Sequence, residues 1–585
     1  MSTNHPETGD STRGTSTGTS TGTSTSTSTR RGEDSLTTNT STATILESTS
    51  VIRRNHPPPE KPADIRRRSW IVLSFWAIVI FLGLPIWWQT TSIYRANLPL
   101  DEMMSWADGK ACQLVFPLQI TLDAPHIQGQ EAQDLLRLTQ KALDELNDFP
   151  LHHLQLRLPE PASDDGMAQA ITEPNNSNSA LTVHVSPGDS TASSLHPHAP
   201  TLEITYPPNS SPSSLADYIA TELRFTFAEE QAIVSYLLST SSIPAEWRPQ
   251  GISQQVTESL SKRMTRSLKY SRTYHLTFSL FTDGPTPQGW DIESAIDEYM
   301  RPILDMLNPI HNFTIDTQVQ FYASPGVQSQ VLSKADLSSF INAAEWPLSP
   351  SIGGAPTINF IVYIGNQTIG LDSDAETSQS WLIPQWGSVY LLAPPTTANH
   401  VGTEALKQPV MTFTSHLLSL LGTPQSGSLP MRLSALTRIR TADLVLRASS
   451  SLGSLARLSS ALPSISIPSQ VADGVAKCLR HLQLACGATS SGSSSLEGSG
   501  NTETETEGLA HAQIAEAEAE RAFFEKSMVG QLYFPDEHKV AVYLPLLGPV
   551  GVPLIMGLLN ELKAWKKRRA EAQQKAQQDK EKKAN

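Results

Sequence analysis

The chain has 585 residues, with 43 Lys and Arg against 57 Asp and Glu, a formal net charge of −14, and only three cysteines. This length accommodates about three domains of ~100–200 residues each, so a hydrophobic core is available without a dense disulfide framework, which three cysteines could not supply. The acidic balance argues against a nucleic-acid-binding protein, because neutralising phosphates requires a clustered basic surface. It leaves membrane association open.

The N-terminal residues 1–68 contain a tract of Thr, Ser and Gly at 15–29, followed by a proline-rich stretch. Large apolar residues are too rare in this segment to form a packed core. We therefore predict a disordered tail over 1–68.

A first apolar run predicts a transmembrane helix over 69–89. Residues 70–88 carry no charge, and about 20 apolar residues suffice to cross a hydrocarbon core of ~30 Å as a helix. The tryptophans at both ends of the run suit the headgroup regions. A cleaved signal peptide is not expected, since a long Ser- and Thr-rich segment precedes the run.

A second uncharged run predicts another transmembrane helix over 541–560. Six prolines and glycines interrupt it: Pro545, Gly548, Pro549, Gly551, Pro553 and Gly557. A bilayer tolerates these residues where neighbouring helices satisfy the freed backbone groups, which predicts a kinked span packed against partner helices. A buried irregular segment is the alternative. The charged tail at 561–585 argues against a removable C-terminal anchor signal.

The charges beside the two runs predict their orientation. Basic residues precede the first run and follow the second: Arg66, Arg67, Arg68, Lys563, Lys566, Lys567, Arg568 and Arg569. Such clusters stay on the cytosolic side, so the residues between the runs are expected to be lumenal. The net charge agrees with this division, since residues 70–560 carry −21 and the two flanking segments carry +2 and +5.

Two further lysines in the basic tail, Lys582 and Lys583, have the spacing of a dilysine retrieval signal. Signals of this kind are addresses read by a receptor. Together with the two spans, they predict a multi-pass protein of the endoplasmic reticulum membrane with both termini in the cytosol.

The predicted lumenal region contains four Asn-x-Ser/Thr patterns, which are candidate N-glycosylation sites: Asn312, Asn366, Asn175 and Asn209. Asn312 and Asn366 are favoured, because the other two lie in stretches rich in Ser and Pro.

All three cysteines, Cys112, Cys478 and Cys486, fall in the same oxidising compartment, where disulfides form and persist. Spacing alone does not establish a pairing. A Cys478–Cys486 disulfide and ordinary buried thiols both remain open.

Residues 90–487 alternate short β-like runs with helical stretches, which predicts a large mixed α/β lumenal domain. The expected strands are 115–122, 153–158, 181–185, 202–206, 274–281, 358–364 and 388–392. A Ser- and Gly-rich stretch at 488–508 predicts a flexible loop. A helix and a pre-membrane segment are expected at 509–540.

Two stretches of the lumenal region share the spacing D-x-P-x-x-Q-G, one starting at Asp123 and the other at Asp283. Each follows an expected strand and precedes a helical stretch that leads to another strand. In the second, Ile292, Ile296 and Met300 recur at helical spacing, so this helix is expected to cover one face of a sheet. The pattern predicts two related β-α-β units, with chance similarity as the alternative.

Motifs for catalysis are weak. The sequence has no dinucleotide-binding turn, P-loop, zinc-protease motif or hydrolase nucleophile elbow. Asp372 and Asp374 form a D-x-D pair that could hold a divalent cation, as in a membrane-anchored lumenal glycosyltransferase. That enzyme is the alternative function, although a solvated acidic loop is the favoured interpretation.

Histidine and serine candidates are weaker still. Four histidines come in close pairs, but no carboxylate or cysteine stands near them at zinc-site spacing: His152, His153, His196 and His198. Ser415 and His416 are adjacent on an expected helix and therefore point apart, so they cannot form a nucleophile–base pair. We predict no catalytic, metal or cofactor-binding residue.

Segments beside both spans resemble the PIG-S family of GPI-transamidase subunits. The C-terminal match comprises Phe523, Phe524, Leu532, Tyr533, Phe534, Pro535, Asp536, Lys539, Tyr543, Pro545, Pro549, Val552 and Pro553. The match after the first span comprises Trp87, Trp88, Thr90, Thr91, Tyr94, Arg95, Ala96, Leu98 and Pro99. Less specific matches lie at Asn312, Phe313, Thr314, Trp386, Gly387 and Tyr390. The resemblance covers about residues 66–569, and the terminal tails and Ser/Gly insertions depart from it.

This resemblance implies a non-catalytic subunit of the complex that removes a C-terminal signal from a precursor protein and attaches a preassembled GPI lipid. In that family the cysteine–histidine dyad belongs to a separate caspase-like subunit. The implied partners are that subunit, the other transamidase subunits, and the lipid and precursor through the complex. Cys478, close to His481, is then a structural thiol.

Overall fold

The computed structural model describes most of the chain, namely residues 61–91, 94–127, 129–146, 152–159, 179–241, 243, 253–341, 346, 354–370, 377–394, 399–463, 465–490, 501–530 and 536–584. The described residues belong to two compact units. One comprises the residues up to Ala77 together with those from Met556 onward, and the other spans Ile78–Ile555.

The first predicted span is helical throughout. α1 (Pro62–Ile78), the π-helical turn η1 (Val79–Gly83) and α2 (Leu84–Thr91) follow one another along the chain. The π turn ends two residues before Pro85, whose ring and missing N–H disturb the regular helical hydrogen bonds. Among the described helices, one stretch, Ala63–Gln89, is long and apolar enough to cross a membrane.

A five-stranded sheet lies at the centre of the first α/β domain. Its strands are β1 (Phe116–Asp123), β2 (His152–Arg157), β3 (Leu181–Pro187), β4 (Ala192–Leu195) and β5 (Thr201–Tyr206), in the spatial order β2-β1-β3-β5-β4. Buried and less buried residues alternate along β3, as expected for a sheet with one covered face. Two helices pack together and against the sheet's apolar residues, namely α4 (Gln130–Leu146) and α5 (Pro212–Thr240).

A second five-stranded sheet forms another α/β domain. Its strands are β6 (Thr273–Thr282), β8 (Asn312–Gln320), β10 (Thr357–Ile364), β13 (Ser380–Ile383) and β14 (Gly387–Leu392), in the spatial order β13-β14-β10-β6-β8. Nearly every residue of β6 and β10 is buried, because both faces of this sheet are covered. One face packs against α7 (Ile292–Tyr299), α8 (Arg301–Leu307) and α10 (Thr403–Leu420). Aromatic side chains such as Phe340 and Trp346 cover the other.

Short elements complete this second domain. They are α6 (Gln254–Arg266), β7 (Gly289–Trp290), β9 (Val331–Leu332), α9 (Leu337–Phe340), β11 (Thr368–Gly370), β12 (Thr377–Ser378) and β15 (His400–Val401). Gly387 begins β14 at a close backbone approach, since a Cβ there would lie 1.9 Å from the carbonyl oxygen of Asn359. Only glycine fits this position.

The two sheets share one topology. Numbered in chain order within each sheet, the strands are arranged second, first, third, fifth, fourth, and only the fourth strand runs antiparallel to its neighbour. Asp123 ends β1 and Asp283 directly follows β6, so the two D-x-P-x-x-Q-G stretches occupy equivalent loops. Gln128 lies outside the described residues. The predicted pair of related β-α-β units is confirmed at the level of strand order.

One helix of the repeat differs from its prediction. Ile292, Ile296 and Met300 are buried as expected, but the helix is divided at Met300 into α7 and α8. Pro302 explains the division, because it lacks the backbone N–H that would donate to the carbonyl of Glu298, and its ring clashes with that carbonyl.

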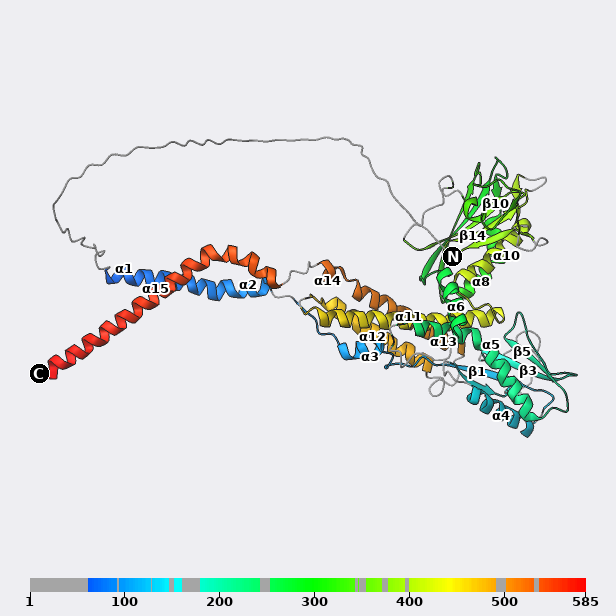
Figure 1. Ribbon diagram of the computed structural model, residues 1–585, viewed down its shortest axis with the longest axis horizontal. Coiled ribbons are helices and arrows are strands. Elements are labelled where there is room, and N and C mark those ends of the chain that lie inside the picture. Colours follow the sequence, from blue (N-terminus) through cyan, green and yellow to red (C-terminus); the bar gives the residue numbers. More distant parts are fainter. Residues whose placement is uncertain are drawn as a thin grey trace, which may run out of the picture. The chain divides into compact units, whose positions relative to one another are not determined.

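A bundle of helices joins the two α/β domains. It comprises α3 (Leu100–Ala107), α11 (Leu429–Ala461), α12 (Ser469–Ser490) and α13 (Asn501–Phe523), followed by the short α14 (Lys526–Gly530). Figure 1 shows α11, α12 and α13 side by side along their lengths. α12 and α13 are antiparallel, since Gly474 lies against Ala522 at one end and Ala488 lies against Gly508 at the other.

Both ends of the predicted flexible loop at 488–508 are helical in the structure. α12 continues to Ser490, and α13 begins at Asn501 rather than near residue 509. Residues 491–500 lie outside the described part of the chain. The first turns of α13 are helical because they pack against α11, where Glu505 pairs with Arg438.

The second predicted span, 541–560, lies within α15 (Asp536–Ala584), a helix of 49 residues. Pro545, Pro549 and Pro553 stand inside it, and Figure 1 shows the helix curving in this region. Apolar side chains are exposed along it, as for Leu544 at 70%. Whether this stretch crosses a membrane stays a prediction.

Candidate functional site

The structure does not group the histidine pairs with further metal-binding side chains among the residues that it describes. His152 is buried and its Nε2 lies 3.0 Å from Glu230 Oε1, whereas its neighbour His153 is exposed. His196 accepts backbone hydrogen bonds from His198 and Ala199 at a turn. Among the described residues, no group of three or more His, Cys, Asp or Glu side chains is placed to hold a metal ion.

Ser415 and His416 point apart on α10, in agreement with their adjacency. His416 instead approaches Ser388 of β14, with 2.6 Å between Nδ1 and Oγ. Burial lowers the pKa of His416. Because Ser388 is fully buried within the sheet, this pair fastens α10 to β14 rather than presenting a nucleophile. The sequence held no signal for it, since the two residues lie 28 positions apart.

The remaining candidates are distributed over the surface or fall outside the description. Asn312 is exposed at the start of β8, Asn366 is exposed after β10, and Asn209 is exposed after β5. Asn175 lies outside the described residues, as do Asp372 and Asp374. α15 runs through Lys582 and Lys583.

The cysteine pairing differs from the one considered in the sequence. Cys112 and Cys486 form a disulfide with their Cα atoms 6.1 Å apart, and Cys478 is a buried free thiol. A Cys478–Cys486 bridge is wrong because both residues lie on α12. Eight helical residues separate Cα atoms by about 12 Å, and a disulfide cannot span more than ~7 Å.

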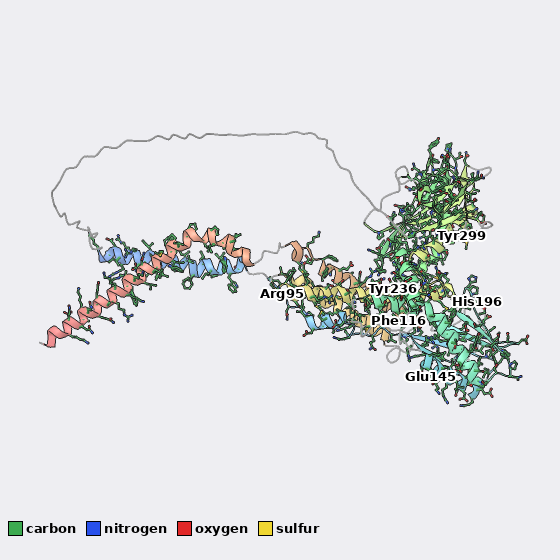
Figure 2. All side chains as sticks on the ribbon, viewed as in Figure 1. Arg95, Phe116, Glu145, His196, Tyr236 and Tyr299 are labelled. Atoms are coloured by element: carbon green, nitrogen blue, oxygen red, sulfur yellow. A yellow bond between two sulfur atoms is a disulfide. The ribbon has the colours of Figure 1, made fainter. Side chains whose placement is uncertain are left out.

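Arg95 clamps the segment after the first span onto the bundle. Its guanidinium donates to the carbonyl oxygens of Ser459, Leu462 and Pro463 at 2.6–3.1 Å. These carbonyls lie at the C-terminal end of α11. The last turn of a helix leaves carbonyl oxygens without intrahelical partners, so a positive charge is favourable there. Backbone pairing with Ile467 on both sides of Arg95 reinforces the contact. Figure 2 shows Arg95 at this end of the bundle. The family-like tripeptide at 94–96 therefore has a structural role.

A buried charged network connects the first α/β domain with the bundle. Arg438 of α11 donates to both carboxylate oxygens of Glu230 at 2.7 and 2.8 Å, and to Glu505 of α13 at 2.9 Å. Burial disfavours the ionised form of Glu230, but Arg438 and His152 outweigh it and hold its pKa far below the usual range. For Glu505 burial prevails and raises the pKa.

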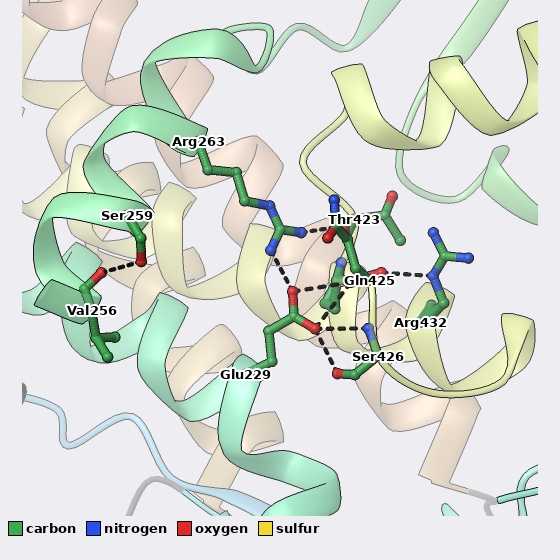
Figure 3. Close-up of polar contacts among 9 residues, drawn as sticks. Glu229, Val256, Ser259, Arg263, Thr423, Gln425, Ser426 and Arg432 are labelled. Atoms are coloured by element: carbon green, nitrogen blue, oxygen red, sulfur yellow. Dashed lines mark hydrogen bonds and ion pairs between the residues drawn. The ribbon is translucent and has the colours of Figure 1, made fainter. Parts of the chain in front are cut away.

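A second polar junction connects α5 with α6 and with the loop before α11. Glu229 accepts hydrogen bonds from the side chain of Arg263, from the backbone N–H groups of Gln425 and Ser426, and from the Ser426 hydroxyl (Figure 3). Arg263 also donates to the carbonyl of Thr423 at 2.6 Å. Partial burial opposes ionisation, but these donors lower the pKa of Glu229 from 4.5 to about 2.

The Glu229 junction predicts an acid-sensitive contribution to stability. A carboxyl group whose pKa is lowered on folding stabilises the protein above its unfolded pKa, and this stabilisation is lost as pH falls from about 4.5 to about 2. We expect Glu229→Gln to unfold more easily than the parent at pH 7, with the difference shrinking across that window. Unfolding midpoints measured in denaturant at several pH values provide the check. A difference that stayed constant with pH would contradict the assignment.

The sequence matches known proteins along most of its length. The sequence model of one family, phosphatidylinositol-glycan biosynthesis class S protein (PIG-S), matches residues 74–568. The GPI-anchor transamidase component PIGS of Rattus norvegicus is 26% identical over 569 residues, covering 86% of this chain and 97% of its own. The GPI transamidase component GPI17 of Saccharomyces cerevisiae is 24% identical, covering 85% of this chain and 92% of its own. The GPI transamidase component PIG-S homolog of Schizosaccharomyces pombe is 26% identical, covering 88% of this chain and 87% of its own. Because the family match extends over far more than half of its length, the chain belongs to the PIG-S family.

Proposed function

We propose that this protein is a non-catalytic subunit of the GPI transamidase complex of the endoplasmic reticulum. The observation that carries the proposal is the family match over residues 74–568, which includes most of the first predicted span, all of the second and the whole region between them. Relatives that align along nearly their full lengths are named as transamidase components. In this role the protein supports attachment of preassembled GPI lipids to precursor proteins with C-terminal signals.

The states of the three cysteines support a non-catalytic role for this subunit. Transamidation through a thiol needs an accessible thiolate with a nearby base. Cys112 and Cys486 are joined to each other, and Cys478 is buried. Burial raises the pKa of the Cys478 thiol to about 12, so it is protonated at neutral pH. The nucleophile is therefore proposed to lie in a separate, caspase-like partner subunit.

Replacing Cys478 tests this division of labour. We expect Cys478→Ala to leave transamidation largely intact in the assembled complex, with a stability cost of about 1 kcal/mol from the lost buried sulfur. The measurement is GPI attachment to a reporter precursor, normalised to the amount of folded complex. Complete inactivation of a folded complex would count against the supporting role.

We also propose that both predicted spans cross the membrane, with cytosolic termini and a lumenal region between them. Contacts between the two span ends support this topology: Arg68 Nε lies 3.5 Å from Glu561 Oε2, and the Ser69 hydroxyl donates to the same carboxylate. Arg568 donates to Glu561 as well, at 2.6 Å. A hairpin of two spans brings the start of the first and the end of the second to one side. The lysine pair Lys582 and Lys583 then lies in the cytosol, where a retrieval receptor reads it.

Glycosylation reports on the same topology. We expect Asn312 and Asn366 to carry N-glycans, because both are exposed and both lie in the proposed lumenal region. Endoglycosidase treatment should increase the electrophoretic mobility of the protein, and the double variant Asn312→Gln/Asn366→Gln should shift less. No mobility change in the parent protein would contradict a lumenal location for these sites.

The function itself is tested by purifying the tagged full-length protein in mild detergent. The expected result is co-purification of a subunit with a caspase-like cysteine–histidine dyad. In cells depleted of the protein, precursors should retain their C-terminal signals, and the parent sequence should restore attachment. Normal attachment after depletion would contradict the proposal.

A further inference from the structure

One end of the helical bundle is the junction with the membrane segments. Tyr94 accepts a backbone hydrogen bond from Ile467, the residue that precedes the start of α12 by two positions. The C-terminal end of α11 is held at the same place by Arg95. α13 ends there too, because it runs antiparallel to α12 and its Ala522 faces Gly474 near the α12 start. The chain thus leaves this end toward both predicted spans.

Two aromatic side chains are exposed at this end. Tyr94 is 64% exposed and Phe524 is 68% exposed. The neighbouring Phe523 packs partly into the core and meets the Phe524 ring edge to face, with 5.0 Å between centroids. Phe523 therefore anchors the helix end, while Phe524 points away from the packed interior.

Chain length restricts the distance of Tyr94 from the bilayer. The uncharged run 70–88 extends about 28 Å as a helix, which matches a hydrocarbon core of ~30 Å and puts Trp88 at its lumenal edge. α2 ends at Thr91, and three further residues span at most about 11 Å. Tyr94 therefore lies within about 15 Å of the hydrocarbon edge even at full extension.

Phe524 lies close to Ile467, the backbone partner of Tyr94, in its position along the bundle axis. It follows Ala522 by two residues on a helix antiparallel to α12, which places it opposite the first turn of α12. With a rise of 1.5 Å per residue, its level differs from that of Ile467 by roughly 8 Å along the bundle. The two exposed aromatic rings therefore lie at the same end of the bundle, where the chain leads into the predicted spans.

We propose that Tyr94 and Phe524 insert into the headgroup layer of the lumenal leaflet and fix the end of the bundle against the bilayer. The tyrosine ring is favoured at that depth because it places an apolar body and a polar hydroxyl across the interface. The phenylalanine ring is favoured because it leaves water for the boundary between headgroups and acyl chains. The Arg95 clamp and the Phe523 anchor hold the two rings on a rigid support. The proposal rests on the membrane span of the proposed function, and the occupant of the surface is the lipid itself.

Site-directed spin labelling tests the proposal in the full-length protein reconstituted in lipid nanodiscs. Single labels are placed by Tyr94→Cys and Phe524→Cys in a Cys478→Ala background with the Cys112–Cys486 disulfide intact. Collisions with oxygen, which partitions into lipid, are compared with collisions with a water-soluble nickel chelate. Both replaced side chains are exposed, and retention of the disulfide and of the unfolding temperature verifies the fold of each variant.

Two controls bracket the expected values. Phe81, 80% exposed within the first span, reports the hydrocarbon core after Phe81→Cys. Phe225, 78% exposed on α5, reports water after Phe225→Cys. α5 meets α11 at Arg438, which precedes Ser459 by 21 residues, so Phe225 is roughly 30 Å or more from the Arg95 end along α11.

We expect the ratio of oxygen collisions to nickel-chelate collisions at positions 94 and 524 to lie well above the ratio at position 225. It should be shifted toward the ratio at position 81. An aqueous ratio at both positions, with a lipid ratio at Phe81, would overturn the proposal and leave the span intact. The same labels are also measured in the purified complex, where immobilisation and shielding from both reagents would overturn the proposal in favour of a partner subunit. An aqueous ratio at Phe81 would instead overturn the span on which the proposal rests.

Discussion

Replacing Arg438 with Met is expected to lower the free energy of unfolding by about 3–5 kcal/mol, because it leaves two buried carboxylates without their counter-ion. Glu230 and Glu505 both depend on this guanidinium, and Arg438 is almost fully buried. The substitution keeps a long apolar stem, so loss of packing contributes little. Denaturant unfolding of the purified protein in mild detergent measures the change.

Acidification should distinguish this charge effect from simple damage to the core. Without Arg438, burial favours the protonated form of both carboxyl groups, so keeping them ionised destabilises the variant increasingly as pH rises. The parent behaves oppositely at Glu230, whose lowered pKa favours folding at neutral pH. The stability difference between parent and Arg438→Met should therefore narrow as pH falls from 7 to 5.

A matched control is available at Arg301, which pairs with Asp297 four residues earlier and is half exposed. Arg301→Met should cost no more than about 1 kcal/mol, as usual for a solvated pair. Equal costs at Arg301 and Arg438 would contradict the importance of the buried network. The triple variant Arg438→Met/Glu230→Gln/Glu505→Gln should recover part of the loss, since neutral amides are less costly to bury than unpaired carboxylates.

The second large effect is expected at the disulfide. Cys112→Ser/Cys486→Ser should lower the free energy of unfolding by about 2–5 kcal/mol, because the bridge closes a loop between residues 374 positions apart. Cys112 lies just before β1 and Cys486 on α12, so the bond fastens the start of the first α/β domain to the bundle.

The disulfide can be verified independently of stability. Alkylation of the denatured protein without reductant should modify one cysteine, Cys478, and reduction should expose two more. The control Cys478→Ala should retain the bridge, and its free energy of unfolding should match that of the parent to within about 1 kcal/mol. Modification of Cys112 without reductant would contradict the assigned pairing.

Local patterns sufficed for much of the architecture. Each of the seven expected strands appears within one or two residues of its predicted position, as for β10 at Thr357–Ile364 against 358–364. Alternating or continuous apolar runs of this length have few other ways to bury their side chains. The D-x-P-x-x-Q-G spacing was also informative, since it marks the loop that connects a strand to the next helix.

The sequence by itself determined the first apolar helix, the mixed α/β class, the repeated units and the family resemblance, because these depend on composition and on residues close together in the chain. The tertiary structure alone decided that Cys112 pairs with Cys486 and that Arg438 pairs with both Glu230 and Glu505. It also decided that Arg95 binds the C-terminal carbonyls of α11. Each of these contacts joins residues at least 67 positions apart. Their formation depends on how separate helices and sheets pack, and neither spacing nor periodicity carries that information.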